Sequence, residues 1–429
     1  ALYGSRAANG VVIIETKKGK ARAAAGKKGI GVTINTGASF DMVSILPKYQ
    51  NEYGGGYGWD TLWYSEDKEG FPNRPSGYYT GINTHDTVIG PYEDTYDLMP
   101  NYAVDESWGE KLNGQMHRPW YSWQENISEY YGKNVPWEAH EDNIRDFYKL
   151  GQTWTNNIAL TGGSQDANFR LSYTNVQQHG VAPNSKRDKN TINFSGNTKL
   201  SDRLTAFTNF NYINTKGDGL VGTGYDGANV MNSFNQWFQR QLDMEKIHDY
   251  WLNPDGTQNS WNRTAWDNPF PKYWDNPYWT RFKNYGNDSR DRIFGNVGFT
   301  YEFTDWLKLT GRVNKDFYTD RREERRAVGS NEISYYQEGI RQLSETNTEF
   351  LLEFNKYVTE DLSIQALIGG NQMTRKYNRN VGSTSGGLPI PGFENLANTT
   401  DPISVDDYKT KKRINSLYGR VSLGWRSMI

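Results

Sequence analysis

Segments in which apolar and polar residues alternate recur along most of this 429-residue chain. In residues 167–174, Ala, Phe, Leu and Tyr occupy the odd positions, and Asn, Arg, Ser and Thr occupy the even ones. A period of two places one face of a β-strand in an apolar medium and the other face in water. About ten such segments occur, near residues 29–40, 154–163, 166–178, 189–200, 203–214, 290–303, 306–318, 341–358, 361–377 and 411–425. The predicted fold class is therefore all-β.

The connections between these segments alternate between short and long. Turns of a few residues follow every second strand, near residues 164, 202, 305 and 360. Short turns at one rim and long loops at the other are typical of an antiparallel transmembrane β-barrel, whose long loops lie outside the cell. We therefore predict long extracellular loops at 41–153, 215–289, 319–340 and 378–410. A large soluble all-β protein with insertions is the alternative, because the alternation alone does not distinguish a protein core from lipid.

Composition excludes several other classes. The chain is 35% hydrophobic and has no run of about 18 apolar residues, so we expect no membrane-spanning helix. A net charge of -2 gives no field that would attract nucleic acid, and the absence of cysteine excludes thiolate metal sites and disulfides. The first residue is Ala1 rather than Met, and no signal segment precedes it. We therefore expect the chain to be part of a longer polypeptide.

No motif indicates catalysis. The five histidines show no HExxH or other paired spacing, and no G-x-S-x-G nucleophile elbow is present. Residues 217–222 match G-x-G-x-x-G, but the preceding strand alternates, whereas a dinucleotide-binding strand is apolar on both faces. Residues 253–256 (NPDG) form a turn sequence and lack the carboxylates of a calcium loop. We expect no enzymatic activity, no catalytic or metal-binding residues and no cofactor.

Two stretches carry a family resemblance. Residues 1–20 (ALYGSRAANGVVIIETKKGK) resemble the end of the plug domain in SusC/RagA-type TonB-dependent transporters. Residues 155–185, with TNNIALTGG, NFRLSY, QHG and APNS, resemble the second to fourth barrel strands of the same family, and weaker similarity continues through NPYW at 276–279 to about Trp425. The resemblance implies a large, plugged barrel of the 22-stranded class. Residues 1–20 would then end the plug, and residues 21–429 would form the N-terminal part of the barrel.

Tryptophan is concentrated in two of the long connections. Of the 15 tryptophans, 12 lie within 41–153 and 215–289. Aromatic faces stack on sugar rings and other planar groups, whereas long loops also need small cores of their own. We expect most of these residues to form loop cores, and a minority around 59–64 and 120–123 to remain exposed to a ligand. The candidate substrate-binding residues are Trp59, Trp63, Tyr64, Trp120, Trp123 and Trp237.

Charged residues also occur on the polar phase of the predicted strands. They include Arg170, Glu302, Arg312 and Arg420. In a barrel this phase faces the lumen, where buried charges need partners. We therefore predict that these residues contact the plug.

The resemblance implies a function and a set of partners. The expected function is TonB-dependent import of an oligomeric nutrient across the bacterial outer membrane, with a glycan preferred as substrate. A peptide importer of the same family is one alternative, and a passive porin or surface adhesin is another. The expected partners are a SusD-like surface lipoprotein that closes over the barrel mouth, the TonB complex through an upstream segment, an oligosaccharide or peptide substrate, and outer-membrane lipid.

Overall fold

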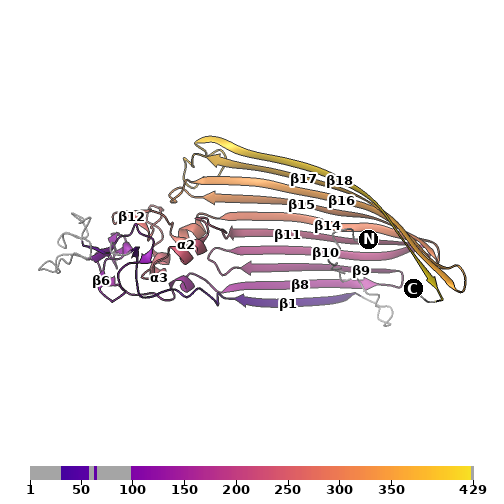
Figure 1. Cartoon of the computed structure of the whole chain (residues 1–429), viewed down its shortest axis with the longest axis horizontal. Coiled ribbons are helices and arrows are strands. Elements are labelled where there is room, and N and C mark those ends of the chain that lie inside the picture. The colour runs from indigo at the N-terminus through magenta and orange to yellow at the C-terminus, as the bar shows by residue number, and fades with distance from the viewer. Residues whose placement is uncertain (1–29, 58–61, 65–97, 427–429) are drawn as a thin grey trace.

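The computed structural model describes residues 30–57, 62–64 and 98–426 of the chain. Ten strands form one antiparallel sheet, in which each strand pairs with the next one along the chain (Figure 1). The all-β prediction of about ten strands is thereby confirmed, whereas the expected plug segment at 1–20 lies outside the described residues. The strands are β1 (Gly31–Asp41), β8 (Gly151–Gly163), β9 (Ala167–His179), β10 (Lys186–Ser201), β11 (Leu204–Leu220), β14 (Gly286–Thr304), β15 (Leu307–Arg326), β16 (Tyr335–Tyr357), β17 (Leu362–Ser385) and β18 (Asp401–Trp425).

Tight turns join the strands at one end of the sheet. In three of them a hydroxyl side chain accepts a hydrogen bond from the backbone N–H three residues further on. The Ala167 N–H donates to Ser164 Oγ at 3.2 Å, the Leu204 N–H to Ser201 Oγ at 3.2 Å, and the Leu362 N–H to Thr359 Oγ1 at 3.0 Å. This local bond satisfies a backbone group that the strand ladder leaves unpaired, and it explains the small hydroxyl residue in these turns.

The register collects the apolar positions of all ten strands on one face. Residues directly opposite each other share a face, and at one flank Val32, Leu160, Leu171, Phe194 and Phe210 stand opposite one another in succession. The same face continues to β18 at the other flank. Its large side chains are exposed, with Val297 61% and Val421 69% accessible. We call this the apolar face and the opposite one the polar face. A continuous exposed apolar surface of this extent is suited to lipid rather than to water.

The strands extend further toward the long connections than the alternation predicts. β15 ends at Arg326, β17 ends at Ser385 and β18 begins at Asp401. In the extensions of β15 and β17 most residues on both faces are polar, and in that of β18 only Ile403 and Val405 continue the apolar face, so the hydrogen-bonded ladder continues where the alternation has faded. The connections are consequently 42–150, 221–285, 327–334 and 386–400, each shorter than the predicted 41–153, 215–289, 319–340 and 378–410.

The two longest connections fold together at the end of the sheet away from the tight turns (Figure 1). We call this unit, formed by the described residues of 42–150 and 221–285, the loop module. None of the described helices is long and apolar enough to cross a membrane. The helices are η3 (Trp120–Trp123), α1 (Asn143–Asp146), α2 (Val230–Gln236), α3 (Met244–Asp249) and α4 (Pro277–Phe282). The short strand pairs of the loop module are β2 (Gly56–Tyr57) with β5 (Ser107–Trp108), β3 (Leu62–Tyr64) with β4 (Leu98–Pro100), β6 (Met116–His117) with β7 (Val135–Pro136), and β12 (Arg263–Ala265) with β13 (Asn268–Pro271).

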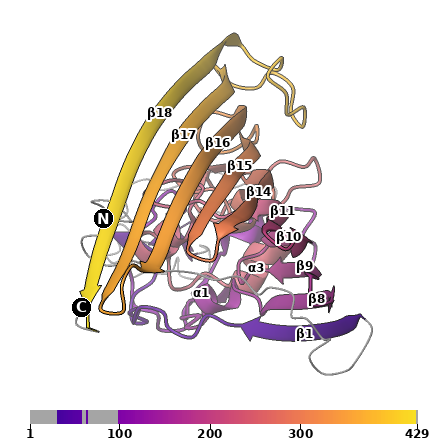
Figure 2. The ribbon, with the colours of Figure 1, turned by 90° about the vertical axis from the view of Figure 1, so that its right-hand side faces the viewer.

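The sheet is open, with β1 at one edge and β18 at the other (Figure 2). It curves between these edges, and the strands lengthen from 11 residues in β1 to 25 residues in β18. Among the described residues neither β1 nor β18 has a second neighbour in the sheet.

Candidate substrate site in the loop module

The loop module has an aromatic core formed between its two connections. Phe147, which is fully buried, packs edge-on against Phe234 with ring centroids 4.9 Å apart. Trp261, 2% exposed, packs in the same way against Phe238 at 5.4 Å. Such pairs contribute about 0.5–1.5 kcal/mol each beyond the burial of their area. Segments about a hundred residues apart in sequence therefore form one folded unit.

This core contains two residues that were expected to be exposed. Trp120 is 4% exposed and Trp123 is 9% exposed, and the Trp123 Nε1–H donates to the Tyr102 hydroxyl at 2.7 Å. The expectation that both remain open to ligand is wrong, because residues 221–285 pack over η3 and exclude solvent from it. Trp120 and Trp123 instead belong with the tryptophans that form loop cores, which were expected to be the majority.

The remaining candidates are placed differently. Trp237 is half-buried at the end of α2, and its indole N–H has no hydrogen-bond partner among the described residues. Trp63 and Tyr64 belong to β3, which pairs with β4. Trp59 lies outside the described residues. A role in binding substrate therefore stays a prediction for each of the six candidates.

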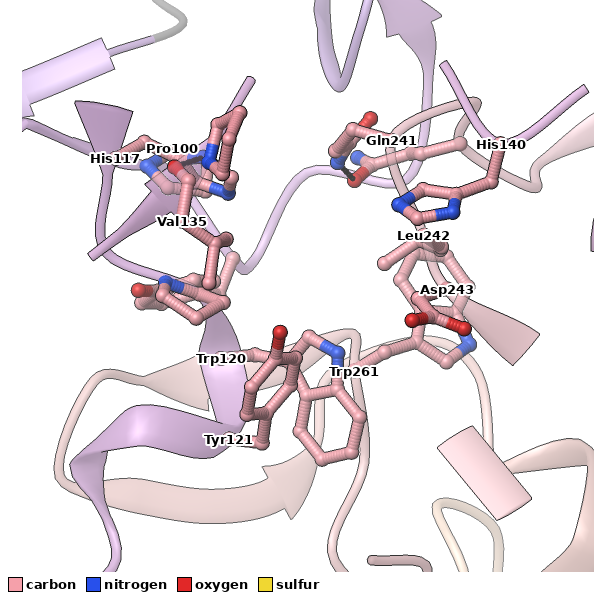
Figure 3. A pocket seen from close by; sticks show the side chains of 14 residues that line it. Pro100, His117, Trp120, Tyr121, Val135, His140, Gln241, Leu242, Asp243 and Trp261 are labelled. Atoms are coloured by element: carbon pink, nitrogen blue, oxygen red, sulfur yellow. Dashed lines mark hydrogen bonds between the residues drawn. The ribbon is translucent and has the colours of Figure 1, made fainter. Parts of the chain in front are cut away.

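A small cavity opens beside η3 (Figure 3). Its free volume is about 30 Å³. Its aromatic and apolar walls come from both connections, and His140 and Asp243 add polar groups. The aromatic and apolar lining residues include Trp120, Tyr121, Val135, Leu242 and Trp261. The cavity thus has room for one small group.

His117 stands at the edge of this cavity as a neutral group. Burial lowers the pKa of the imidazole to about 3, and its Nδ1–H donates to the Val135 carbonyl at 3.0 Å. The ring also packs edge-on against Trp137 at 4.7 Å. His117 therefore fixes the β6–β7 pair, and it carries no charge toward a ligand at neutral pH.

Arg281 connects the loop module to the rim of the sheet. This fully buried side chain on α4 donates to the carbonyls of Pro183 at 3.0 Å, Asn184 at 3.2 Å, Gly219 at 2.6 Å and Leu220 at 3.3 Å. Asn184 Nδ2 returns a bond of 2.8 Å to the Arg281 carbonyl. One guanidinium thereby joins α4, the β9–β10 connection and the end of β11.

Gly219 permits the close approach that this junction requires. Its φ is +65°, and a Cβ at this position would lie 1.6 Å from the Asn184 carbonyl oxygen. Only glycine fits such a left-handed and crowded backbone position. Residues 217–220 of the G-x-G-x-x-G match thus belong to the end of β11, and Gly219 belongs to this packing junction.

Asp275 joins the loop module to the 327–334 connection. Its carboxylate accepts hydrogen bonds from Gln258 Nε2 at 2.7 Å, from the Asn331 N–H at 2.8 Å and from Asn284 Nδ2 at 3.0 Å. Burial nevertheless raises the pKa of Asp275 to about 6, and the Gln258 bond only partly opposes this rise. Asp105, which accepts from Trp274 Nε1 at 2.7 Å, is likewise raised by burial to a pKa of about 6.

We expect the docking of the 327–334 connection to weaken as pH rises. A carboxyl whose folded pKa exceeds its unfolded pKa binds its proton more tightly when folded, so its contribution is present below the unfolded value near 4 and is lost as pH passes through about 6. Between pH 4 and 7 the loss from Asp275 should be about 2–3 kcal/mol. Amide hydrogen exchange of residues 329–332, corrected for intrinsic rates, measures it.

A pair of substitutions isolates this carboxyl. Asp275→Asn should flatten the pH dependence, whereas Asp267→Asn, at an exposed position in the β12–β13 hairpin, should leave it unchanged. An equal pH slope in wild type and Asp275→Asn would contradict the assignment.

The charged candidates on the polar face are paired largely within the sheet. Arg312 forms an ion pair with Glu349 on β16, and Glu302 forms one with Lys308 on β15 at 2.8 Å. Arg170 donates to Ser172 Oγ at 2.7 Å, and Arg420 lies on the edge strand β18. These ion pairs neutralise Arg312 and Glu302 within the sheet. Contacts of the four residues with the plug stay a prediction.

Sequence reasoning missed Arg281 and Asp275. The start of α4 has a recognisable sequence signal, because Asn followed by Pro is common at helix N-termini. In the structure the Asn276 side chain accepts from the Tyr278 N–H, and Pro277 occupies the first turn. The acceptors of Arg281 are backbone carbonyls up to 98 residues distant, and no sequence signal identifies such partners.

No family model matches the chain. The chain is 24% identical to the TonB-dependent receptor P26 of Formosa agariphila, over 99% of the chain and 36% of that receptor. Its fold is similar to the RagAB peptide importer in the open-open state, with a TM-score of 0.63 and 16% identity over 99% of the chain and 42% of the solved chain. The closed-closed state gives 0.61 and 15%, over 99% and 43%.

The chain thus spans less than half the length of these proteins. The match to the Formosa receptor extends over almost the whole chain, and the ten-stranded antiparallel sheet corresponds to part of the barrel wall in the solved structures. The chain is thus similar to TonB-dependent receptors over almost its whole length, and its fold is that of part of a RagA-like β-barrel of the bacterial outer membrane.

Proposed function

We propose that the chain forms part of a TonB-dependent importer that carries an oligomeric nutrient across the outer membrane. The observation that carries this proposal is the continuous apolar face of ten strands, backed by a polar face with paired charges. The loops 42–150, 221–285, 327–334 and 386–400 would lie outside the cell, and the tight turns would lie in the periplasm. Transport, rather than an enzymatic reaction, is the corresponding activity.

We favour a peptide as the substrate, although the aromatic loops had suggested a glycan. The two solved structures cited above are of a peptide importer. The tryptophans that suggested sugar stacking at 120–123 are buried in a loop core. The cavity of about 30 Å³ beside η3 is roughly a tenth of the smallest usual ligand pocket, so it would accept one side chain and not a sugar ring.

The proposed partners are a SusD-like surface lipoprotein over the loop module and the TonB complex on the periplasmic side. The name RagAB denotes a two-component importer, and this supports the first partner. A lid would retain a weakly bound oligomer that otherwise leaves an open vestibule. A passive porin or an adhesin needs neither a lid nor TonB, so dependence on TonB distinguishes these alternatives.

Uptake by cells tests the proposal. Cells that carry the full receptor should take up a fluorescent oligopeptide, and deletion of the receptor gene or of tonB should abolish this uptake. A fluorescent oligosaccharide of equal mass serves as the matched substrate. Uptake of the peptide that persists without TonB would support a porin, and uptake of the oligosaccharide alone would restore the glycan assignment.

A further inference from the structure

Four cations lie together on the apolar face, on the side of the loop module. They are Lys315 on β15, Lys376 on β17, and Lys411 and Arg413 on β18, and all four are exposed. We call them the basic patch. Strands β15 to β18 are consecutive neighbours in the sheet, so the patch extends over four adjacent strands (Figure 1).

The patch places like charges directly opposite each other. Lys376 stands opposite Lys411 in the register, and its other cross-strand neighbour is Ser344. Arg413 stands opposite Thr374, two residues along β17 from Lys376. Like charges in direct cross-strand register are destabilising, and no carboxylate occupies a neighbouring position on these strands that would offset them.

Lys315 approaches the same patch from the other side. Its Nζ donates to Ser344 Oγ at 2.7 Å and to Thr346 Oγ1 at 2.9 Å. Ser344 is the residue directly opposite Lys376, so the Lys315 ammonium lies beside the lysine pair. Within the described part of the chain, none of the four cations forms an ion pair.

Two other lysines on the apolar face have acidic neighbours. Lys186 stands opposite Asp218, and Lys216 stands opposite Asp188. Each also has an acid two residues along its own strand, with Lys186–Asp188 at 3.0 Å and Lys216–Asp218 at 3.5 Å. Charge compensation is therefore present on β10 and β11 and missing in the basic patch.

The patch lies toward the loop-module end of the apolar face. Lys315 stands between the exposed Val313 and Phe317 on β15, and Lys411 and Arg413 stand between the exposed Val405 and Leu417 on β18. Lys315 lies eight residues from the start of β15, and Arg413 lies twelve residues from the end of β18. With a rise of about 3.3 Å per residue and a tilt of about 40°, these cations lie roughly 20 and 30 Å above the tight-turn end of the strands. An apolar band about 25 Å tall ends near this height, so the patch lies at its border with the lipid headgroups, and long basic side chains reach further along the surface.

We propose that the basic patch binds the phosphate groups of a lipid in the outer leaflet of the membrane. This inference rests on the proposed function only in placing the apolar face in the outer membrane. Phosphate supplies the anion that the opposed lysines lack, and it accepts from several ammonium and guanidinium groups at once. Bound lipid would hold β15 to β18 in register by removing their mutual repulsion.

Native mass spectrometry of the full receptor in mild detergent tests this. The delipidated receptor is titrated with diphosphoryl lipid A and with its dephosphorylated form. Wild type should bind the phosphorylated lipid preferentially. The double variant Lys376→Gln/Lys411→Gln should bind it about tenfold or more weakly, since each cation near an anionic surface contributes of the order of a fivefold effect. The matched control Lys186→Gln/Lys216→Gln should bind as wild type does.

Three outcomes would overturn the inference. These are equal binding of the dephosphorylated lipid, equal binding by the Lys376/Lys411 variant, and displacement of the lipid by an equal concentration of inorganic phosphate. Retained mobility of each variant on an unheated SDS gel shows that the barrel is folded. Peptide uptake is scored separately, so a receptor that binds lipid but imports nothing contradicts the proposed function and not the basic patch.

Discussion

Expressed alone, residues 1–429 will fail to form a closed, heat-resistant barrel. β1 and β18 each have one unpaired edge within the described structure, and the sheet between them is open. About ten residues of each strand cross the hydrocarbon region, so each edge would leave about ten backbone N–H and C=O groups without a partner in lipid. Each such group costs several kcal/mol, and no open sheet edge is tolerated there.

Mobility on unheated SDS gels after refolding into detergent measures this. The full receptor should migrate as a compact band that shifts on boiling, whereas the 429-residue chain should migrate at the same position in both conditions. Oligomers of the shorter chain are an expected by-product, because an exposed strand edge pairs with another chain. A compact monomer band from residues 1–429 that disappears on boiling would contradict the prediction.

The strands were predictable because each one records its surroundings in its own sequence. In β9 the apolar Leu171 and Tyr173 alternate with the polar Ser172, and this pattern indicates which side chains face lipid. The ends of β15, β17 and β18 were not predictable, since most residues there are polar on both faces and the period of two is weak or lost. A hydrogen-bonded ladder needs no side-chain pattern, so the strands continue for about eight to ten residues beyond the alternation.

The loop module was predictable only in its composition. Twelve tryptophans in two connections indicated both cores and binding surfaces, and nothing local separated the two uses. Trp120 and Trp123 are buried by residues of the other connection, which begins about a hundred residues later. The basic patch was hidden for a similar reason, because Lys376 and Lys411 become neighbours only through the register of β17 and β18.

Arg281 is the side chain whose loss should most disturb the loop module. Its four carbonyl acceptors come from the β9–β10 connection and from the end of β11, and no carboxylate is among them. Burial lowers the pKa of the guanidinium to about 10, so the group is still charged at neutral pH. Removal of the side chain would leave the buried carbonyls of Pro183 and Gly219 without their donor, at a cost of about 1–3 kcal/mol each.

We therefore expect Arg281→Met to destabilise the docking of α4 on the rim by about 3–5 kcal/mol, the usual cost of removing one partner from a buried charged network. Hydrogen exchange at 183–185, 219–222 and 277–285 should accelerate by two to three orders of magnitude, since about 1.4 kcal/mol is tenfold. Arg281→Lys should be intermediate, because an ammonium has three donors and lacks the planar fork that reaches four carbonyls. Lys283→Met, two residues further on, is the control for loss of a cation from the same helix end. The tight-turn end of the strands should exchange as in wild type in all three variants, because the ladder there does not depend on α4. Unchanged exchange at 219–222 in Arg281→Met would show that packing of the aromatic core, and not this guanidinium, holds the loop module to the sheet.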